Sequence, residues 1–320
     1  MQKYEEKIQS NKLFNNYLIN RTPLNILVFF AVVAGIDICV GTAGDFFQSH
    51  AKGGDTRKTD DLVSKERHDI LIFGSSRACH HYDTPFLSDT LGMDVFNAGY
   101  DGNGVVLSYG LLSLVLERYQ PKLIVFDVEP SFDIIKYAAD NDNKRYINTL
   151  KPYYKNPVVA SVIKGVSEEE YYKNYSGMMR YNTTIISKAL DYMGGSAVVN
   201  KGFVPMYGVY TGEPEKKIRQ ASEIDAYKLD CFANMLAMVK SKDIPMMVVA
   251  SPKYGEENTE ELQPIIDICN KNQVPFVDYY ADSMFMSHKE WFKEPMHLNA
   301  EGARVFSGSI SGVISSRLSE

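Results

Sequence analysis

The sequence contains few cysteines and no closely spaced pair of them. Its four cysteines, Cys39, Cys79, Cys231 and Cys269, form no CxxC motif, so neither a zinc site nor a redox dithiol is indicated, and a disulfide framework is not expected. Cys231 and Cys269 lie in apolar helical patterns and are predicted to fill the core. Cys79 could be either a core residue or a reactive thiol.

Basic residues are also in deficit. The chain has 34 Lys and Arg against 40 Asp and Glu, a net charge of -6, whereas nucleic-acid binders normally carry a basic stripe. The sequence also lacks a GxGxxG or P-loop motif, which argues against a nucleotide or flavin site. We therefore expect no nucleic-acid partner, no cofactor and no metal.

One apolar run, residues 23–43, approaches the roughly 20 residues that a membrane-spanning helix needs. Its apolar side chains cover all sides of a helical wheel, unlike those of a surface helix in a globular protein. Asp37 interrupts the run, but it lies about one turn from the end of the span, where the free-energy cost of a charge in the membrane is smaller than at the centre. The sequence predicts a tail over 1–22 and a single-pass anchor over 23–43. Because Gly41-Thr42-Ala43 resembles a signal-peptidase site, a cleaved signal peptide is the alternative.

The residues on either side of this run suggest an orientation. Arg21 before it and acidic residues after it favour an N-terminus inside the cell and a domain on the outer face of the membrane. Residues 44–66 are polar, highly charged and contain glycine, which predicts a linker. The folded domain is expected over 67–320.

From residue 68 onward, apolar runs alternate with segments of helical periodicity. This pattern is typical of a parallel sheet with crossover helices, and predicts an α/β fold: a flavodoxin-like three-layer sandwich with a five-stranded parallel sheet. The predicted strands cover 68–74, 93–97, 122–128, 246–250 and 274–279, and the predicted helices 105–119, 221–240, 260–270 and 300–316.

Residues 131–220 break the alternation between the third and fourth strands. The segment is too long for an ordinary connection and shows several short helical patterns, so we expect a helical insertion. It is rich in tyrosine, and these rings could either stack against sugars or pack the insertion onto the sheet. The tyrosines concerned are Tyr153, Tyr154, Tyr171, Tyr172 and Tyr175.

Chemistry in an open parallel sheet gathers at the carboxyl ends of its strands. The first strand ends in Gly74-Ser75-Ser76-Arg77, a sharp turn into a short helix. A serine there gains an exposed hydroxyl and nearby backbone N–H groups that can hold an oxyanion. The alternative is that Ser75 or Ser76 only caps the helix.

Two further segments complete the candidate site. The second strand is followed by a glycine-rich loop that contains Gly102 and Asn103, where the backbone can approach a bound group. Near the C-terminus, Glu294 precedes His297 by three residues in a loop restricted by Pro295. A carboxylate at this spacing can orient the histidine ring, which leaves the other ring nitrogen to take a proton from a serine.

This combination resembles the SGNH (GDSL-like) hydrolase superfamily over 68–320, outside the insertion. The resemblance implies that Ser76 is the nucleophile, His297 the base and Glu294 its acid partner. It also implies that the backbone N–H groups of Ser76 and Gly102 hold the oxyanion. Glu294 replaces the usual Asp of the D-x-x-H block, and G-S-S replaces the commoner G-D-S.

The third block of the family, normally G-x-N-D, is replaced by Phe-Asp-Val-Glu-Pro-Ser at 126–131. The oxyanion asparagine is therefore absent, and Ser131 is the candidate substitute. A similar loss occurs in membrane-anchored relatives such as the D-alanine transfer protein of teichoic acid synthesis. This resemblance implies a serine esterase or O-acyltransferase acting on an acylated cell-surface glycan, with a membrane-bound O-acyltransferase as a candidate partner. The alternative is an inactive binding component of a polysaccharide modification or export complex.

The remaining polar residues near these motifs are less informative. Arg77 could contact a charged substrate or pair with Asp83, and Asn103 is a candidate substrate contact. The adjacent His80 and His81 would point in different directions and so would not chelate a metal. His68 and His288 are expected at the surface.

Overall fold

A five-stranded parallel sheet forms the centre of the molecule. The computed structural model describes residues 2–136, 142–194, 200–213, 223–256 and 259–319. The strands are β1 (Ile70–Gly74), β2 (Val95–Gly99), β3 (Leu123–Asp127), β4 (Met246–Ala250) and β5 (Phe276–Asp278). Their order is β2-β1-β3-β4-β5 and every pair is parallel. This is the predicted flavodoxin-like fold, and each predicted strand is found within two residues at either end.

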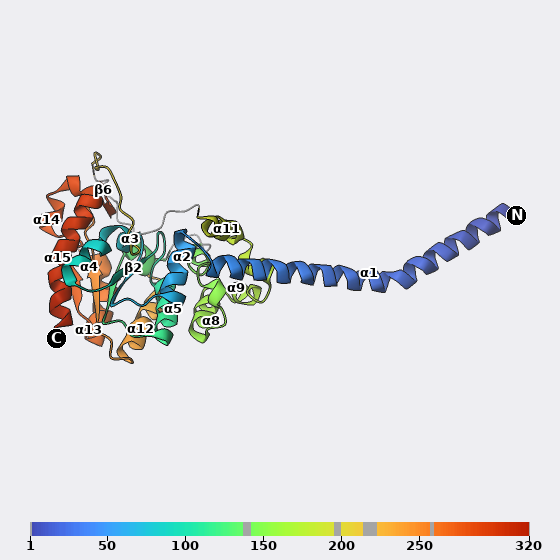
Figure 1. Cartoon of the computed structure of the whole chain (residues 1–320), viewed down its shortest axis with the longest axis horizontal. Coiled ribbons are helices and arrows are strands. Elements are labelled where there is room, and N and C mark those ends of the chain that lie inside the picture. Colours follow the sequence, from blue (N-terminus) through green and yellow to red (C-terminus); the bar gives the residue numbers. More distant parts are fainter. Residues whose placement is uncertain (1, 137–141, 195–199, 214–222, 257–258, 320) are drawn as a thin grey trace.

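Helices cover both faces of the sheet, as the apolar strands require. Along β1, Leu71 and Phe73 face one buried cluster, while Ile70 and Ile72 face the other. The first cluster is closed by α5 (Val105–Arg118), α12 (Ala226–Lys240) and α13 (Gln263–Asn272). The second is closed by α3 (Ser76–His81), α4 (Thr84–Leu91) and α15 (Ala300–Leu318). The result is the expected three-layer sandwich (Figure 1).

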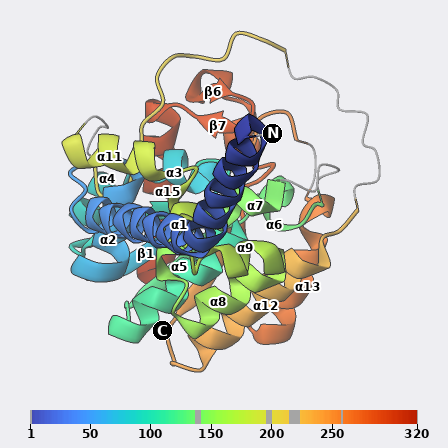
Figure 2. The same cartoon turned by 90° about the vertical axis from the view of Figure 1, so that its right-hand side faces the viewer.

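The predicted insertion between β3 and β4 is largely helical in its described parts up to residue 194, whereas 200–213 forms no helix. It contains α6 (Pro130–Asp133), α7 (Asp142–Tyr146), α8 (Pro157–Val166), α9 (Glu168–Lys173), α10 (Gly177–Tyr181) and α11 (Ile185–Met193). Residues 137–141, 195–199 and 214–220 of the predicted insertion lie outside the described residues. Figures 1 and 2 show α8, α9 and α11 gathered at one end of the molecule.

The N-terminal helix α1 (Gln2–Ser49) leaves the molecule at that same end (Figures 1 and 2). Its part from Thr22 to Ser49 has a mean hydropathy of 2.4 over its most apolar window and is long and apolar enough to cross a membrane. The C-terminal part of α1 packs against α10 and α11. Gly41 faces Gly177 so closely that a Cβ on Gly177 would lie 2.6 Å from the Gly41 Cα.

The linker that the sequence predicts over 44–66 is not found. These residues continue α1, then form α2 (Gly54–Asp60) and a π-helical turn, Asp61–Lys65. Thr56, Lys58 and Thr59 are buried. The polar composition that suggested a tether instead supplies internal hydrogen bonds: the buried Lys58 ammonium, for example, donates to the Gly202 carbonyl at 3.2 Å.

Candidate active site

The turn after β1 separates two adjacent serines by role. Gly74 has a φ of 147°, and a Cβ there would lie 2.5 Å from the Asp127 carbonyl oxygen, so the turn requires glycine. Ser75 is the N-cap of α3, and its Oγ accepts the Arg77 N–H at 3.4 Å. Because Ser75 does the capping, the Ser76 hydroxyl is left for other contacts.

The Ser76 hydroxyl meets His297. Its Oγ lies 2.7 Å from Nε2 of His297, and Nδ1 of the same ring hydrogen-bonds to Oε1 of Glu294. The structure thus brings together the three side chains that the sequence singled out, from chain positions more than 200 residues apart. We call this set the Ser76–His297–Glu294 array.

A two-stranded hairpin holds His297 and Glu294. Glu294 ends β6 (Phe292–Glu294), and His297 begins β7 (His297–Leu298), where the two residues pair directly. Burial alone would raise the pKa of Glu294, but hydrogen bonds from His297 and from the Met296 N–H outweigh it and hold that pKa below its ordinary value. Glu294 is therefore a carboxylate at neutral pH, as an acid partner must be.

A second, buried histidine supports the hairpin. Nε2 of His81 accepts the Leu298 N–H at 3.0 Å, so the ring proton must lie on Nδ1, which faces the Ser251 Oγ at 2.9 Å. Ser251 in turn donates to Asp127 at 3.1 Å. Burial, followed by the charges of Arg77 and His297, places the pKa of His81 well below its ordinary value. A neutral His81 thus fixes the backbone next to His297.

Arg77 belongs to this buried network. Its side chain has no exposed area, its guanidinium donates to Ser251, and its Nε lies 3.9 Å from Asp127. The prediction that Arg77 contacts the substrate is therefore wrong, because a fully enclosed guanidinium cannot reach a ligand at the surface. The alternative partner, Asp83, pairs instead with Arg304 at 3.1 Å.

The loop after β2 lies beside the nucleophile turn, since Gly74 and Gly99 are register partners. Gly102 has a φ of 64°, which favours glycine. Asp101 is tied to His80: its Oδ1 lies 3.0 Å from the Nε2 of that ring. The other nitrogen of His80 lies 2.7 Å from the Val204 carbonyl oxygen. His80 thus anchors the loop that would present the Gly102 N–H.

The two other predicted contacts have different outcomes. Asn103 lies in the Gly102 loop and donates to the Asp101 carbonyl at 2.9 Å; its substrate contact stays a prediction. The Ser131 hydroxyl donates to Glu129 at 3.3 Å, and Glu129 caps α6. Ser131 therefore has a local partner, which corrects the expectation that its hydroxyl replaces the missing asparagine.

One group in the described part of the chain has the spacing of metal ligands: Cys79, His80 and Asp101. The Cys79 thiol is buried, and burial raises its pKa to about 11. The Lys58 ammonium lies 4.0 Å from its sulfur. A protonated thiol beside a fixed cation is a poor metal ligand. Burial also decides between the two interpretations of Cys79, in favour of the core.

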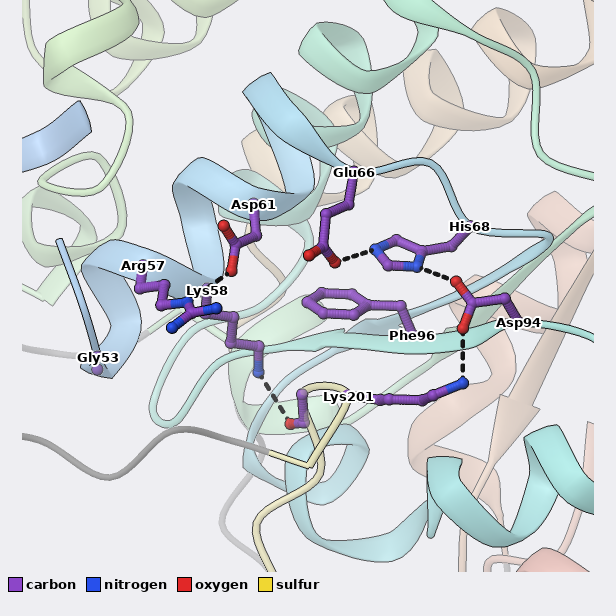
Figure 3. Close-up of a pocket in the computed structure, with 11 residues that line it drawn as sticks. Gly53, Arg57, Lys58, Asp61, Glu66, His68, Asp94, Phe96 and Lys201 are labelled. Carbon is purple, nitrogen blue, oxygen red and sulfur yellow. Dashed lines mark hydrogen bonds and ion pairs between the residues drawn. The ribbon is translucent and has the colours of Figure 1, made fainter. Parts of the chain in front are cut away.

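A pocket lies elsewhere, along the outer edge of the sheet (Figure 3). Its cavity of about 240 Å³ contains none of the Ser76–His297–Glu294 array. Its charged groups are largely paired across its walls: His68 lies 2.6 Å from Asp94, and Lys201 contacts the other oxygen of Asp94 at 2.6 Å. His68 is buried and stacks on Phe96, which corrects its expected place at the surface.

Sequence reasoning missed His81, Ser251 and the His80–Asp101 pair. Their roles depend on contacts between distant segments, and a pair of adjacent histidines carries no local signal for them. The order of strands could have suggested only that residues after β3 and β4, such as Ser251, would lie near the nucleophile turn.

No family model matches this chain, and no curated protein matches it. The chain is similar to solved structures of GDSL-like enzymes at low identity. A GDSL-like lipase from Bacteroides thetaiotaomicron is 13% identical, with 77% of this chain and 87% of that chain covered and a TM-score of 0.36. The acetyl xylan esterase AlAXEase is 11% identical, with 77% and 99% covered and a TM-score of 0.38. These identities and TM-scores are too low to assign a reaction to this chain.

Proposed function

We propose that the protein is a membrane-anchored serine esterase or O-acyltransferase. The observation that carries the proposal is the contact of 2.7 Å between Ser76 Oγ and His297 Nε2, with Glu294 on the other ring nitrogen. A serine within hydrogen-bonding reach of a base that is itself oriented by a carboxylate is the general arrangement of an activated nucleophile.

The reaction proceeds in two halves. Ser76 Oγ attacks the ester carbonyl while His297 Nε2 takes its proton, and Glu294 stabilises the imidazolium that forms. The leaving alcohol receives this proton, and the acyl group stays on Ser76. Water or a sugar hydroxyl then attacks the acyl-serine, with His297 as base, and releases an acid or a new ester.

The oxyanion would be held by the backbone N–H groups of Ser76 and Gly102. An asparagine side chain does not follow β3, where Glu129, Pro130 and Ser131 stand instead. The loss of one such donor typically costs roughly a hundredfold or more in rate. We therefore expect slow hydrolysis of simple esters.

The substrate class follows from the anchor. If α1 spans a membrane with its N-terminus inside, the array faces the outer side, where O-acylated or acylatable glycans are available. A membrane-bound O-acyltransferase that supplies the acyl group is the partner that this arrangement favours. Of the five tyrosines of the insertion, Tyr153, Tyr154 and Tyr171 pack against the core, whereas Tyr172 and Tyr175 are exposed.

The test uses the full chain in detergent with an alkyl phosphonate probe and with p-nitrophenyl acetate. We expect covalent labelling and slow hydrolysis, both abolished by Ser76→Ala. Ser131→Ala is the matched control, because its hydroxyl only contacts Glu129, and it should retain both. Hydrolysis unchanged by Ser76→Ala would exclude the mechanism.

The missing asparagine supports a second candidate, a catalytically inactive binding component of a polysaccharide modification or export complex. In that case the folded chain would take up no phosphonate at Ser76, although the same chain would bind acylated glycan. The labelling experiment thus separates the two candidates.

A further inference from the structure

Helix α11 buries polar side chains and exposes apolar ones. Lys188 and Asp191 are buried, while Ile186, Leu190 and Met193 are 74%, 49% and 67% exposed. A helix at an aqueous surface shows the opposite pattern, with its apolar stripe towards the core. An outward apolar stripe needs an apolar neighbour.

The inward polar face is held by specific contacts with the N-terminal segment. The Lys188 ammonium donates to the side chain of Gln48 on α1, and burial lowers its pKa to about 8. A carboxylate oxygen of Asp191 accepts the Thr56 N–H at 3.4 Å. The orientation of α11 is therefore fixed by α1 and α2, so its apolar face cannot simply rotate inward.

Helices α9 and α10 and the turn between them expose further apolar side chains. Met179 on α10 is 46% exposed, and Tyr172 and Tyr175 are 61% and 65% exposed. Figures 1 and 2 show α9 and α11 at the end of the molecule from which α1 departs. We use the name apolar platform for the set Tyr172, Tyr175, Met179, Ile186, Leu190 and Met193.

The length of α1 brings this platform to the level of a bilayer. Arg21 and Asn20 limit the apolar run on one side, and Asp37 is hydrogen-bonded to the domain. The apolar part before this hydrogen bond, from Thr22 to Ile36, is about 15 residues, or about 22 Å at 1.5 Å per residue. A hydrocarbon core is about 30 Å thick, so about five more residues must enter it, which reaches Gly41.

That part of α1 is already packed against α10. Asp37 accepts the N–H groups of Gly177 at 3.0 Å and of Met178 at 2.9 Å. This contact also explains how a carboxylate is tolerated within the apolar run, because the N-terminus of α10 satisfies it. Any bilayer deep enough to cover α1 therefore reaches α10, and with it the platform.

On the basis of the proposed membrane anchor, we infer that the apolar platform lies in the headgroup and acyl boundary of the same bilayer that α1 spans. Since α11 has nine residues, or about 14 Å at the α-helical rise, it is too short to cross and would lie in the plane of the interface. Tyrosines at the rim fit this position, because their rings are apolar and their hydroxyls reach water.

The test uses tryptophan fluorescence and two kinds of phosphatidylcholine vesicle, one brominated near the headgroup and one brominated near the end of the acyl chains. Trp291 is the only tryptophan of the chain, and Trp291→Phe provides a silent background. Single tryptophans are then introduced in the full chain as Leu190→Trp on the platform, Phe30→Trp in the apolar run, and Ser315→Trp on the exposed side of α15 as a control.

We expect bromine near the headgroup to quench the tryptophan at 190 strongly, bromine near the chain ends to quench the one at 30 strongly, and neither to quench the one at 315 more than weakly. Quenching at 30 without quenching at 190 would overturn the platform while the anchor stands, and would assign the apolar face to a protein partner. No quenching at either position would refute the anchor itself. Tyr175→Trp gives a second platform position, which decides the question if the 190 variant does not fold.

Discussion

Glu294 offers a quantitative test of the Ser76–His297–Glu294 array. Replacement by Gln keeps its size but removes the charge that stabilises an imidazolium on His297. Two unit charges about 4 Å apart interact by about 1 kcal/mol in water and about 4 kcal/mol at a typical protein surface. The Glu294 side chain is 39% exposed, so we take about 2 to 3 kcal/mol, or about 30- to 150-fold in rate.

This expected loss is smaller than the roughly ten-thousandfold loss when a fully buried aspartate of a serine protease becomes asparagine. The assay is the hydrolysis of p-nitrophenyl acetate by the full chain, with kcat and KM measured separately. We expect kcat to fall and KM to stay unchanged. Glu294→Asp is the matched control and should retain most of the activity, since it keeps the charge.

A fall of less than about threefold in kcat for Glu294→Gln, with an unchanged melting temperature, would refute this reasoning. It would mean that the carboxylate is not electrostatically coupled to the step that the base performs. Because hydrogen bonds hold the pKa of Glu294 below its ordinary value, we expect the loss of activity on acidification to come from protonation of a group other than Glu294.

Two further predictions concern the buried network. Because His81 is neutral when folded and titrates near 6.5 when unfolded, its contribution to stability is complete above pH 6.5 and is lost on acidification, by up to about 1.4 kcal/mol per pH unit. Urea unfolding between pH 5 and 7 should therefore show that the free energy of unfolding depends less steeply on pH in His81→Gln than in the wild type. The glutamine amide oxygen can still accept the Leu298 N–H. An equal dependence in the two proteins would contradict a neutral His81. Arg77→Leu should lower the free energy of unfolding by about 3 to 5 kcal/mol, since it leaves the Asp127 carboxylate buried without its cation; a loss below 1 kcal/mol in the same urea assay would show that Arg77 contributes no such pairing.

Much of the fold could be predicted because its signals are local. The strands are continuous apolar runs with both faces buried, and their alternation with helical periods specifies the sheet. The array was also predictable, because Ser76 and Glu294-x-x-His297 each occupy a short segment at the same edge of the sheet. Both inferences needed only the spacing of residues close together in the chain.

The remaining features depend on contacts that no short segment contains. His81 is neutral because it is fully buried, and the groups that meet its two nitrogens, on Leu298 and Ser251, lie 217 and 170 residues away in the chain. The segment 44–66 resembles a linker by composition, but its polar groups, such as Lys58, have buried partners contributed by remote loops. In both cases the partner, rather than the residue type, determines the role.

The unbroken passage from α1 into the domain limits how far the domain can move from α1. A flexible linker over 44–66 would have an r.m.s. end-to-end distance of about 26 Å and would let the domain move by that distance relative to α1. A helix that packs against α10 and α11 allows no such search. If α1 spans a bilayer as proposed, Ser76 is held at one height and one tilt relative to the membrane, and a substrate must come to that height.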